Sequence, residues 1–162
     1  MPVASQIAHA AGSFRMNGGL LDKSIEGLTA DEWHRRPGDC ANSMIWVAGH
    51  IVWARHRVLF FLGKEWSRPW LPVFVRGSNA ADTGLYPSPQ ELTYAWHDVK
   101  VVLTATLEEI SADALSVPGP EKLPSFDGML SGAVSFMAWH ETYHVGQAGY
   151  LRRLLGHEQV AG

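Results

Sequence analysis

The stretch SMIWVAGHIVWARHRVLFFL, residues 43–62, constrains the fold more than any other part of the chain. If it forms a helix, apolar residues lie on almost every side of that helix, and Gly63 follows as a helix-ending residue. Such a helix is either surrounded by other helices or has one face against a partner chain. It also contains His50, whose two ring nitrogens need partners in an apolar setting.

Three further segments have the 3.6-residue periodicity of helices, and they span about residues 3–28, 89–110 and 127–155. The second of them has a clear start signal. Ser88 is placed as its N-cap, with proline at the first helical position and Glu91 completing a capping box. The sequence therefore predicts four long helices.

Residues 64–88 hold many of the proline and glycine loop signals and join the second helix to the third. A connection of about 25 residues is long for a structureless loop, so we expect a crossover that makes functional or interface contacts. We find no repeat, linker or low-complexity tract in the chain. The expected fold is a single all-α domain over residues 1–162, a four-helix bundle with a long connection between helices 2 and 3.

The charge balance argues against several kinds of partner. The net charge is -3 and the sequence pI is near 6.2, so there is no basic excess to bind nucleic acid. No apolar run is long enough for a membrane span, and the N-terminus has no signal-peptide pattern. Cys40 is the single cysteine, which excludes an intrachain disulfide and fits a cytoplasmic protein.

The motif HETYHVGQ, residues 140–147, points to metal chemistry. His140 and His144 are four residues apart on the predicted fourth helix, so their Cβ atoms lie about 5–6 Å apart on one face. Two imidazoles at this spacing can bind one ion, and a glutamate after the first completes the HExxH pattern of zinc peptidases. A catalytic or structural site needs at least one more protein ligand.

The peptidase interpretation fails at the third ligand. The extended metzincin motif needs a glycine where Gln147 stands and a histidine where Tyr150 stands. A glutamate downstream of the motif does not supply the third ligand either, because Glu158 lies beyond the helix-ending Gly156. The chain also has no predicted strand to bind a peptide substrate. We therefore do not expect a zincin peptidase.

The third ligand can instead come from upstream. A buried histidine is often a core residue bonded to a carbonyl or a side chain, and this alternative stays open for His50. A site that joins His50 to His140 and His144 would satisfy all three rings at once between facing helices. His56 is a weaker candidate, because it lies about 240° from His50 around the helix.

The Gly-His pair at 49–50 and the motif at 140–147 resemble the DinB/YfiT-like metalloenzyme superfamily, and the resemblance covers essentially the whole chain. It implies an up-down-down-up four-helix bundle, often dimeric, with a three-histidine metal site. By position, the implied ligands are His50, His140 and His144, and zinc or nickel is the typical metal. Some relatives use a low-molecular-weight thiol, such as bacillithiol or mycothiol, in transferase or isomerase reactions.

Two more residues of the motif are candidate catalytic groups. Glu141 is rotated 100° from His140, so we rank orientation of a ligand imidazole first, a general base second and a solvated charge third. Gln147 lies one turn after His144 and can bond to substrate or to a metal-bound water, or tie helices together as a buried amide. Several aromatic residues are candidates for pocket walls or plain core: Trp46, Trp53, Trp139 and Tyr143.

These observations support two hypotheses. The first is a metal-dependent enzyme whose three-histidine divalent-metal site activates water or a thiol, as a hydrolase or a thiol-dependent S-transferase or isomerase. Its substrate is an unidentified small molecule. The second is a non-catalytic, metal-stabilised dimeric binding module. The apolar helix at 43–62 favours a homodimer in either case.

Overall fold

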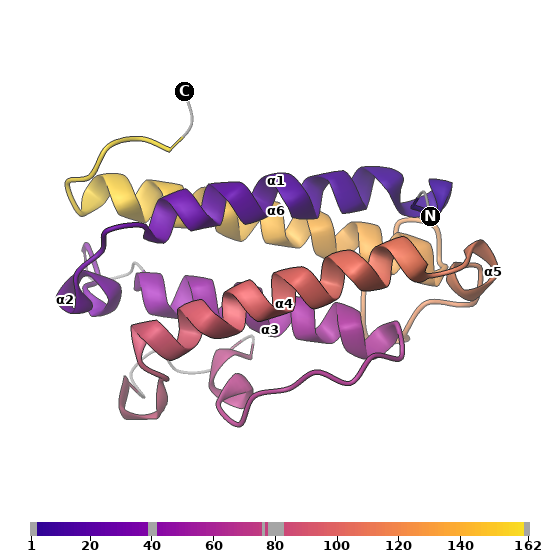
Figure 1. Cartoon of the computed structure of the whole chain (residues 1–162), viewed down its shortest axis with the longest axis horizontal. Coiled ribbons are helices and arrows are strands. Elements are labelled where there is room, and N and C mark those ends of the chain that lie inside the picture. Colours follow the sequence, from indigo (N-terminus) through magenta and orange to yellow (C-terminus); the bar gives the residue numbers. More distant parts are fainter. Residues whose placement is uncertain (1–2, 39–41, 76, 78–82, 161–162) are drawn as a thin grey trace.

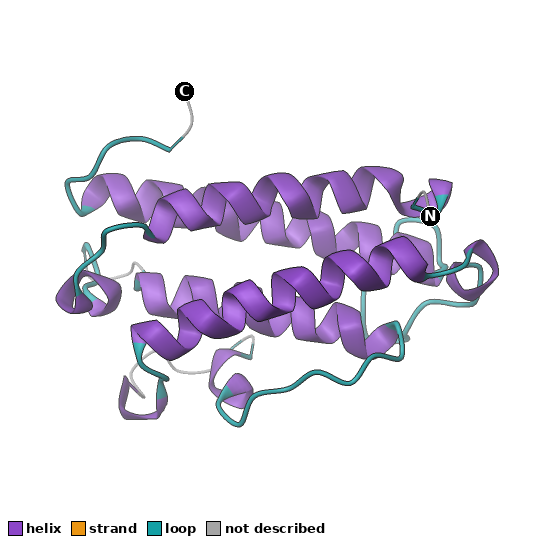
Figure 2. Ribbon diagram, viewed as in Figure 1, coloured by secondary structure: helices purple, strands orange, loops and turns teal. Residues whose placement is uncertain are grey.

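The computed structural model describes residues 3–38, 42–75, 77 and 83–160, and this part of the chain is all-helical, as expected (Figure 2). It contains no named strand; Pro118 and Met129 form an isolated bridge. Cys40 lies outside the described residues. The α-helices are α1 (Ala8–Ile25), α2 (Ala30–His34), α3 (Met44–Phe61), α4 (Pro89–Glu109), α5 (Ala112–Leu115) and α6 (Leu130–Leu154). The 3₁₀ helices are η1 (Ser5–Ile7), η2 (Leu71–Phe74) and η3 (Thr83–Leu85).

The four long helices lie side by side, with α1 and α6 running one way and α3 and α4 the other (Figure 1). α6 packs against both α1 and α3, and α3 also packs against α4, α2 and η2. α3 is therefore surrounded by neighbours within its own chain, which explains why its sequence is apolar on nearly every side. Its buried residues include Ile45, Val52 and Leu59.

The ends of the helices follow local hydrogen bonding. Both backbone and side chain of Ser88 bond to Glu91, which confirms the predicted capping box. The last helix begins at Leu130, three residues later than predicted. The reason is that Asp127 uses its carboxylate to accept the N–H of Met129 at 2.8 Å, and Gly128 has a φ of +78°. These residues form a turn before the helix.

The long connection after α3 returns to α3 through η2. The ring of Phe74 is fully buried and lies directly over Gly49, where a Cβ would come within 2.3 Å of it. Only glycine permits this close approach, which sets the Phe74 backbone beside the residue after Gly49. Residues 76 and 78–82 of the connection lie outside the described residues.

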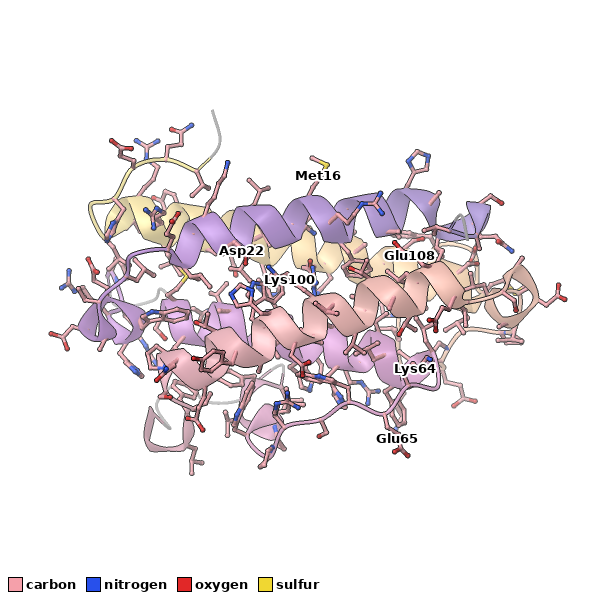
Figure 3. The ribbon with its side chains drawn as sticks, in the orientation of Figure 1. Met16, Asp22, Lys64, Glu65, Lys100 and Glu108 are labelled. Atoms are coloured by element: carbon pink, nitrogen blue, oxygen red, sulfur yellow. The ribbon has the colours of Figure 1, made fainter. Side chains whose placement is uncertain are left out.

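Polar contacts also connect α1 to α4. Figure 3 labels Asp22 of α1 and Lys100 of α4, which form an ion pair between these helices. Asp22 also accepts the indole N–H of Trp96 at 2.7 Å. No helix in the described residues combines the length and apolarity that crossing a membrane requires.

Candidate metal centre

Three imidazole rings meet between α3 and α6. His50 comes from α3, and His140 and His144 come from one face of α6. Nε2 of His140 lies 3.4 Å from Nε2 of His50 and 3.2 Å from Nε2 of His144. His50 and His144 are buried and His140 is half-buried. The fold thus brings together the three histidines that the sequence predicts as metal ligands.

The second nitrogen of two of these rings has an acceptor as its partner. Nδ1 of His50 lies 2.7 Å from the carbonyl oxygen of Phe74, and Nδ1 of His144 lies 2.8 Å from Oε1 of Gln147. Because both oxygens only accept, both Nδ1 atoms carry the proton. This assigns the neutral tautomer in which Nε2 has a bare lone pair, the form that binds metals.

The spacing of the nitrogens fits a metal ion. Two imidazole nitrogens bound to one tetrahedral zinc at about 2.0–2.1 Å lie about 3.3 Å from each other. The Nε2–Nε2 distances from His140 to His50 and to His144 are 3.4 and 3.2 Å. The ligand atoms of all three residues lie within 4.8 Å of one another, and no carboxylate or thiol of the described residues joins the group. Three imidazoles leave a fourth tetrahedral position open.

The protein environment also favours neutral rings. Burial lowers the pKa of His50 from 6.5 to about 4, and this outweighs the hydrogen bond to Phe74, which acts in the opposite direction. The pKa of His144 is lowered too, again chiefly by burial, while its bond to Gln147 opposes the shift. Both rings are therefore uncharged at neutral pH and available to a cation.

Aromatic residues surround the three histidines. The ring of His50 stacks on Trp46 at 4.9 Å and on Trp53 at 5.2 Å. Tyr143 meets His144 edge-on at 5.1 Å, and its side chain is 58% exposed. Trp139 is equally exposed and contacts Phe136. Three of the four aromatic candidates from the sequence therefore contact a ligand ring directly.

Glu141, the glutamate of the HExxH pattern, forms its hydrogen bonds outside the histidine cluster. It is fully buried, and its two carboxylate oxygens each accept a bond of 2.8 Å from Arg55 of α3. Arg55 also donates to the carbonyl of Phe14 on α1 at 2.8 Å. The glutamate therefore ties α6 to α3 at the position next to His140.

Two groups of the site were not found by sequence reasoning. The first is the Phe74 carbonyl, whose only sequence signal is Gly49 beside a histidine in a buried helix. The second is Arg55, and its signal is a charged residue inside an otherwise apolar helix. Neither signal identifies its partner, which lies 24 residues away for His50 and 86 residues away for Arg55.

Comparisons with known proteins agree with this fold. The family model of the DinB superfamily matches residues 13–148. A solved structure described as the conserved protein of locus from Enterococcus faecalis superimposes with a TM-score of 0.72 at 16% identity, covering 95% of this chain and 97% of that one. At this identity the likeness concerns the fold alone. No curated protein matches the sequence.

Proposed function

Because the chain belongs to the DinB superfamily, we propose that it is a metal-dependent enzyme whose divalent ion is held by His50, His140 and His144. The observation that carries the proposal is the pair of bare Nε2 lone pairs on His50 and His144, directed at a third imidazole 3.2 to 3.4 Å away. Without a cation between them, two such acceptors have at most one proton to share.

The metal would supply an open coordination position at which water or a thiol is activated for attack. The residues of the chain prepare this position. The Phe74 carbonyl and Gln147 hold two of the ligand rings in the correct tautomer, and the indoles of Trp46 and Trp53 hold His50 in place by stacking. Gln147 thus acts through His144, and Glu141 acts by fixing α6 against α3.

The finer features of the proposal are those that membership of the family implies. The chain is one DinB-like domain, a four-helix bundle of up-down-down-up order, and the antiparallel pairs of long helices in Figure 1 support this. Zinc or nickel is the proposed metal, since three imidazoles suit both. The reaction is a hydrolysis or a transfer or isomerisation that uses a low-molecular-weight thiol, on a small-molecule substrate in the cytoplasm.

The test is metal-dependent turnover. Zinc- and nickel-loaded protein is offered bacillithiol, mycothiol or glutathione with a generic electrophile, and separately a panel of activated esters. Turnover that disappears in His140→Ala and in the metal-free wild type supports the enzyme. If a fully loaded protein turns over neither class of substrate, the enzymatic proposal fails.

One observation favours a second candidate, a metal-stabilised homodimeric binding module without turnover. Trp139, Tyr143 and Tyr150 lie on α6 at spacings of four and seven residues, and each is more than half exposed. Such a stripe of aromatic residues suits helix packing against a second copy of the chain. Sedimentation of the wild type beside Tyr150→Glu tests the dimer. A metal-loaded dimer that turns over neither class of substrate supports this module over the enzyme.

A further inference from the structure

The indole N–H of Trp46 is a buried hydrogen-bond donor that has no partner among the residues that the structure describes. Buried tryptophan N–H groups normally find an acceptor, because an unpaired donor loses its hydration and gains nothing in return. Two other tryptophans of this chain follow that rule. Trp66 donates to Asp98 at 2.8 Å and Trp96 donates to Asp22 at 2.7 Å. The unused donor of Trp46 therefore requires an explanation.

Its position supplies one. The Trp46 ring lies parallel to His50, with ring centres 4.9 Å apart and planes 6° apart, and it meets the edge of His144 at 6.2 Å. It stands four residues before His50 on α3, one turn away on the same face. The unpaired donor thus belongs to a side chain that packs on two of the three candidate metal ligands.

We propose that the N–H of Trp46 donates a hydrogen bond to the ligand at the open position of the metal, and so selects ligands that keep a lone pair after binding the ion. Thiolates and oxyanions have this property. An indole N–H only donates, so Trp46 cannot itself bind the metal. A hydrogen bond to a negatively charged acceptor is stronger than one to a neutral acceptor, which favours anionic ligands further. This inference rests on the proposed metal site.

A purely structural role for Trp46 makes a different prediction. If the indole only packs against His50, removing its N–H removes an unpaired buried donor, and the affinity of the metal for its outside ligand stays the same. The two roles are separated by comparing two kinds of ligand. Thiocyanate keeps lone pairs after it binds a metal, whereas imidazole uses its only lone pair on the metal and then presents an N–H.

The experiment uses the full chain loaded with cobalt(II), whose visible absorption reports each ligand that enters the coordination sphere. Wild type, Trp46→Phe and Trp53→Phe are titrated with thiocyanate and with imidazole. Phenylalanine keeps a ring against His50 but lacks the N–H. Trp53→Phe is the matched control, because Trp53 also stacks on His50 and its N–H is not a buried unpaired donor.

The expected result is a loss of thiocyanate affinity by about tenfold to a hundredfold in Trp46→Phe, the range for a hydrogen bond to a charged group. Imidazole affinity and cobalt content should stay close to wild type. Trp53→Phe removes an indole that stacks on His50 without removing an unpaired donor, so it should change the affinity for thiocyanate and for imidazole by the same factor. If Trp46→Phe does not fold, Trp46→3-benzothienylalanine keeps the ring shape and replaces the N–H by sulfur.

Any of four outcomes overturns the inference. Unchanged thiocyanate affinity in Trp46→Phe removes the donor role while leaving the metal site intact. An equal loss for thiocyanate and imidazole in Trp46→Phe, or the same selective loss of thiocyanate affinity in Trp53→Phe, shows a packing effect in place of a hydrogen bond. A wild type that binds no cobalt removes both the inference and the proposed function, and this result is visible before any ligand is added.

Discussion

Arg55 and Glu141 form a two-pronged ion pair inside the helix packing, with Nε–Oε2 and Nη2–Oε1 distances both 2.8 Å. The side chains are 2% and 0% exposed. The same guanidinium donates to Phe14 of α1 and lies 4.4 Å from the ring centre of Trp96 on α4. A single side chain of α3 thus contacts the other three long helices. Because Glu141 directly follows His140, the ion pair also fixes the position along the α6 axis at which the two histidines of this helix face His50.

Removal of one partner of this pair should destabilise the protein strongly. Glu141→Leu leaves a buried, unpaired guanidinium, and we expect a loss of about 3–5 kcal/mol in the free energy of unfolding. The measurement is urea denaturation of the metal-free protein. The double variant Arg55→Met with Glu141→Leu removes both charges and should recover most of the loss. A single variant as stable as the wild type would contradict the structural role assigned to the pair.

The hydrogen bond from His144 to Gln147 should strengthen metal binding. Gln147→Leu removes the acceptor that holds His144 in its metal-binding tautomer. Loss of such a bond typically weakens metal affinity by about 10- to 100-fold. Competition with a zinc chelator measures the change. Gln147→Glu keeps an acceptor at the same place and should remain much closer to wild type. Equal zinc affinity in all three proteins would show that Gln147 does not support the ligand.

Gly49 should be irreplaceable even by alanine. A Cβ at this position would lie 2.3 Å from the buried ring of Phe74, so η2 must shift and its carbonyl must leave His50. Overpacking of this kind costs about 1–3 kcal/mol. Gly146→Ala is the matched control, because a Cβ there meets no atom within 4 Å. In a helix interior it should stabilise by about 0.5–1 kcal/mol. Thermal denaturation measures the melting temperature of both variants. Melting temperatures that shift in the same direction would contradict this account.

The stability of the metal-free protein should depend on pH through His50. Its pKa falls from 6.5 to about 4 on folding, because burial disfavours the charged ring. Between these two values the unfolded chain binds more protons than the folded one, so the stability falls as the pH falls. The full effect is about 3 kcal/mol. Urea denaturation at several pH values should therefore show a steeper decline below pH 6.5 for wild type than for His50→Phe. Parallel declines in the two proteins would refute the assignment.

Much of the fold could be predicted from local sequence patterns. The long helices follow from apolar periodicity, and the capping box of Ser88 and Glu91 sets the start of α4 within one residue. The proximity of His140 and His144 follows from their spacing alone. That His50 joins them was expected on chemical grounds, and the three rings are indeed close together.

The remaining features depend on contacts between distant segments. The path of residues 71–74 across Gly49 is set by how one aromatic ring fits over one glycine, which no periodic pattern encodes. The sequence likewise does not predict the partner of Glu141, because any buried cation on a facing helix could form the ion pair. Local exceptions matter too. Asp127 is a good helix-start residue by sequence, yet its carboxylate stabilises a preceding turn and delays the helix to Leu130.

The central claim is the metal site built across α3 and α6, and elemental analysis of purified, tag-free protein tests it most directly. Wild type is measured beside His50→Ala, His140→Ala and His56→Ala, the last a histidine of α3 outside the cluster. The account predicts about one divalent ion per chain in wild type and in His56→Ala, and loss of the ion in the other two variants. A metal-free wild type that also fails to bind added zinc and nickel would contradict the account, and the three histidines would then be polar residues of the core.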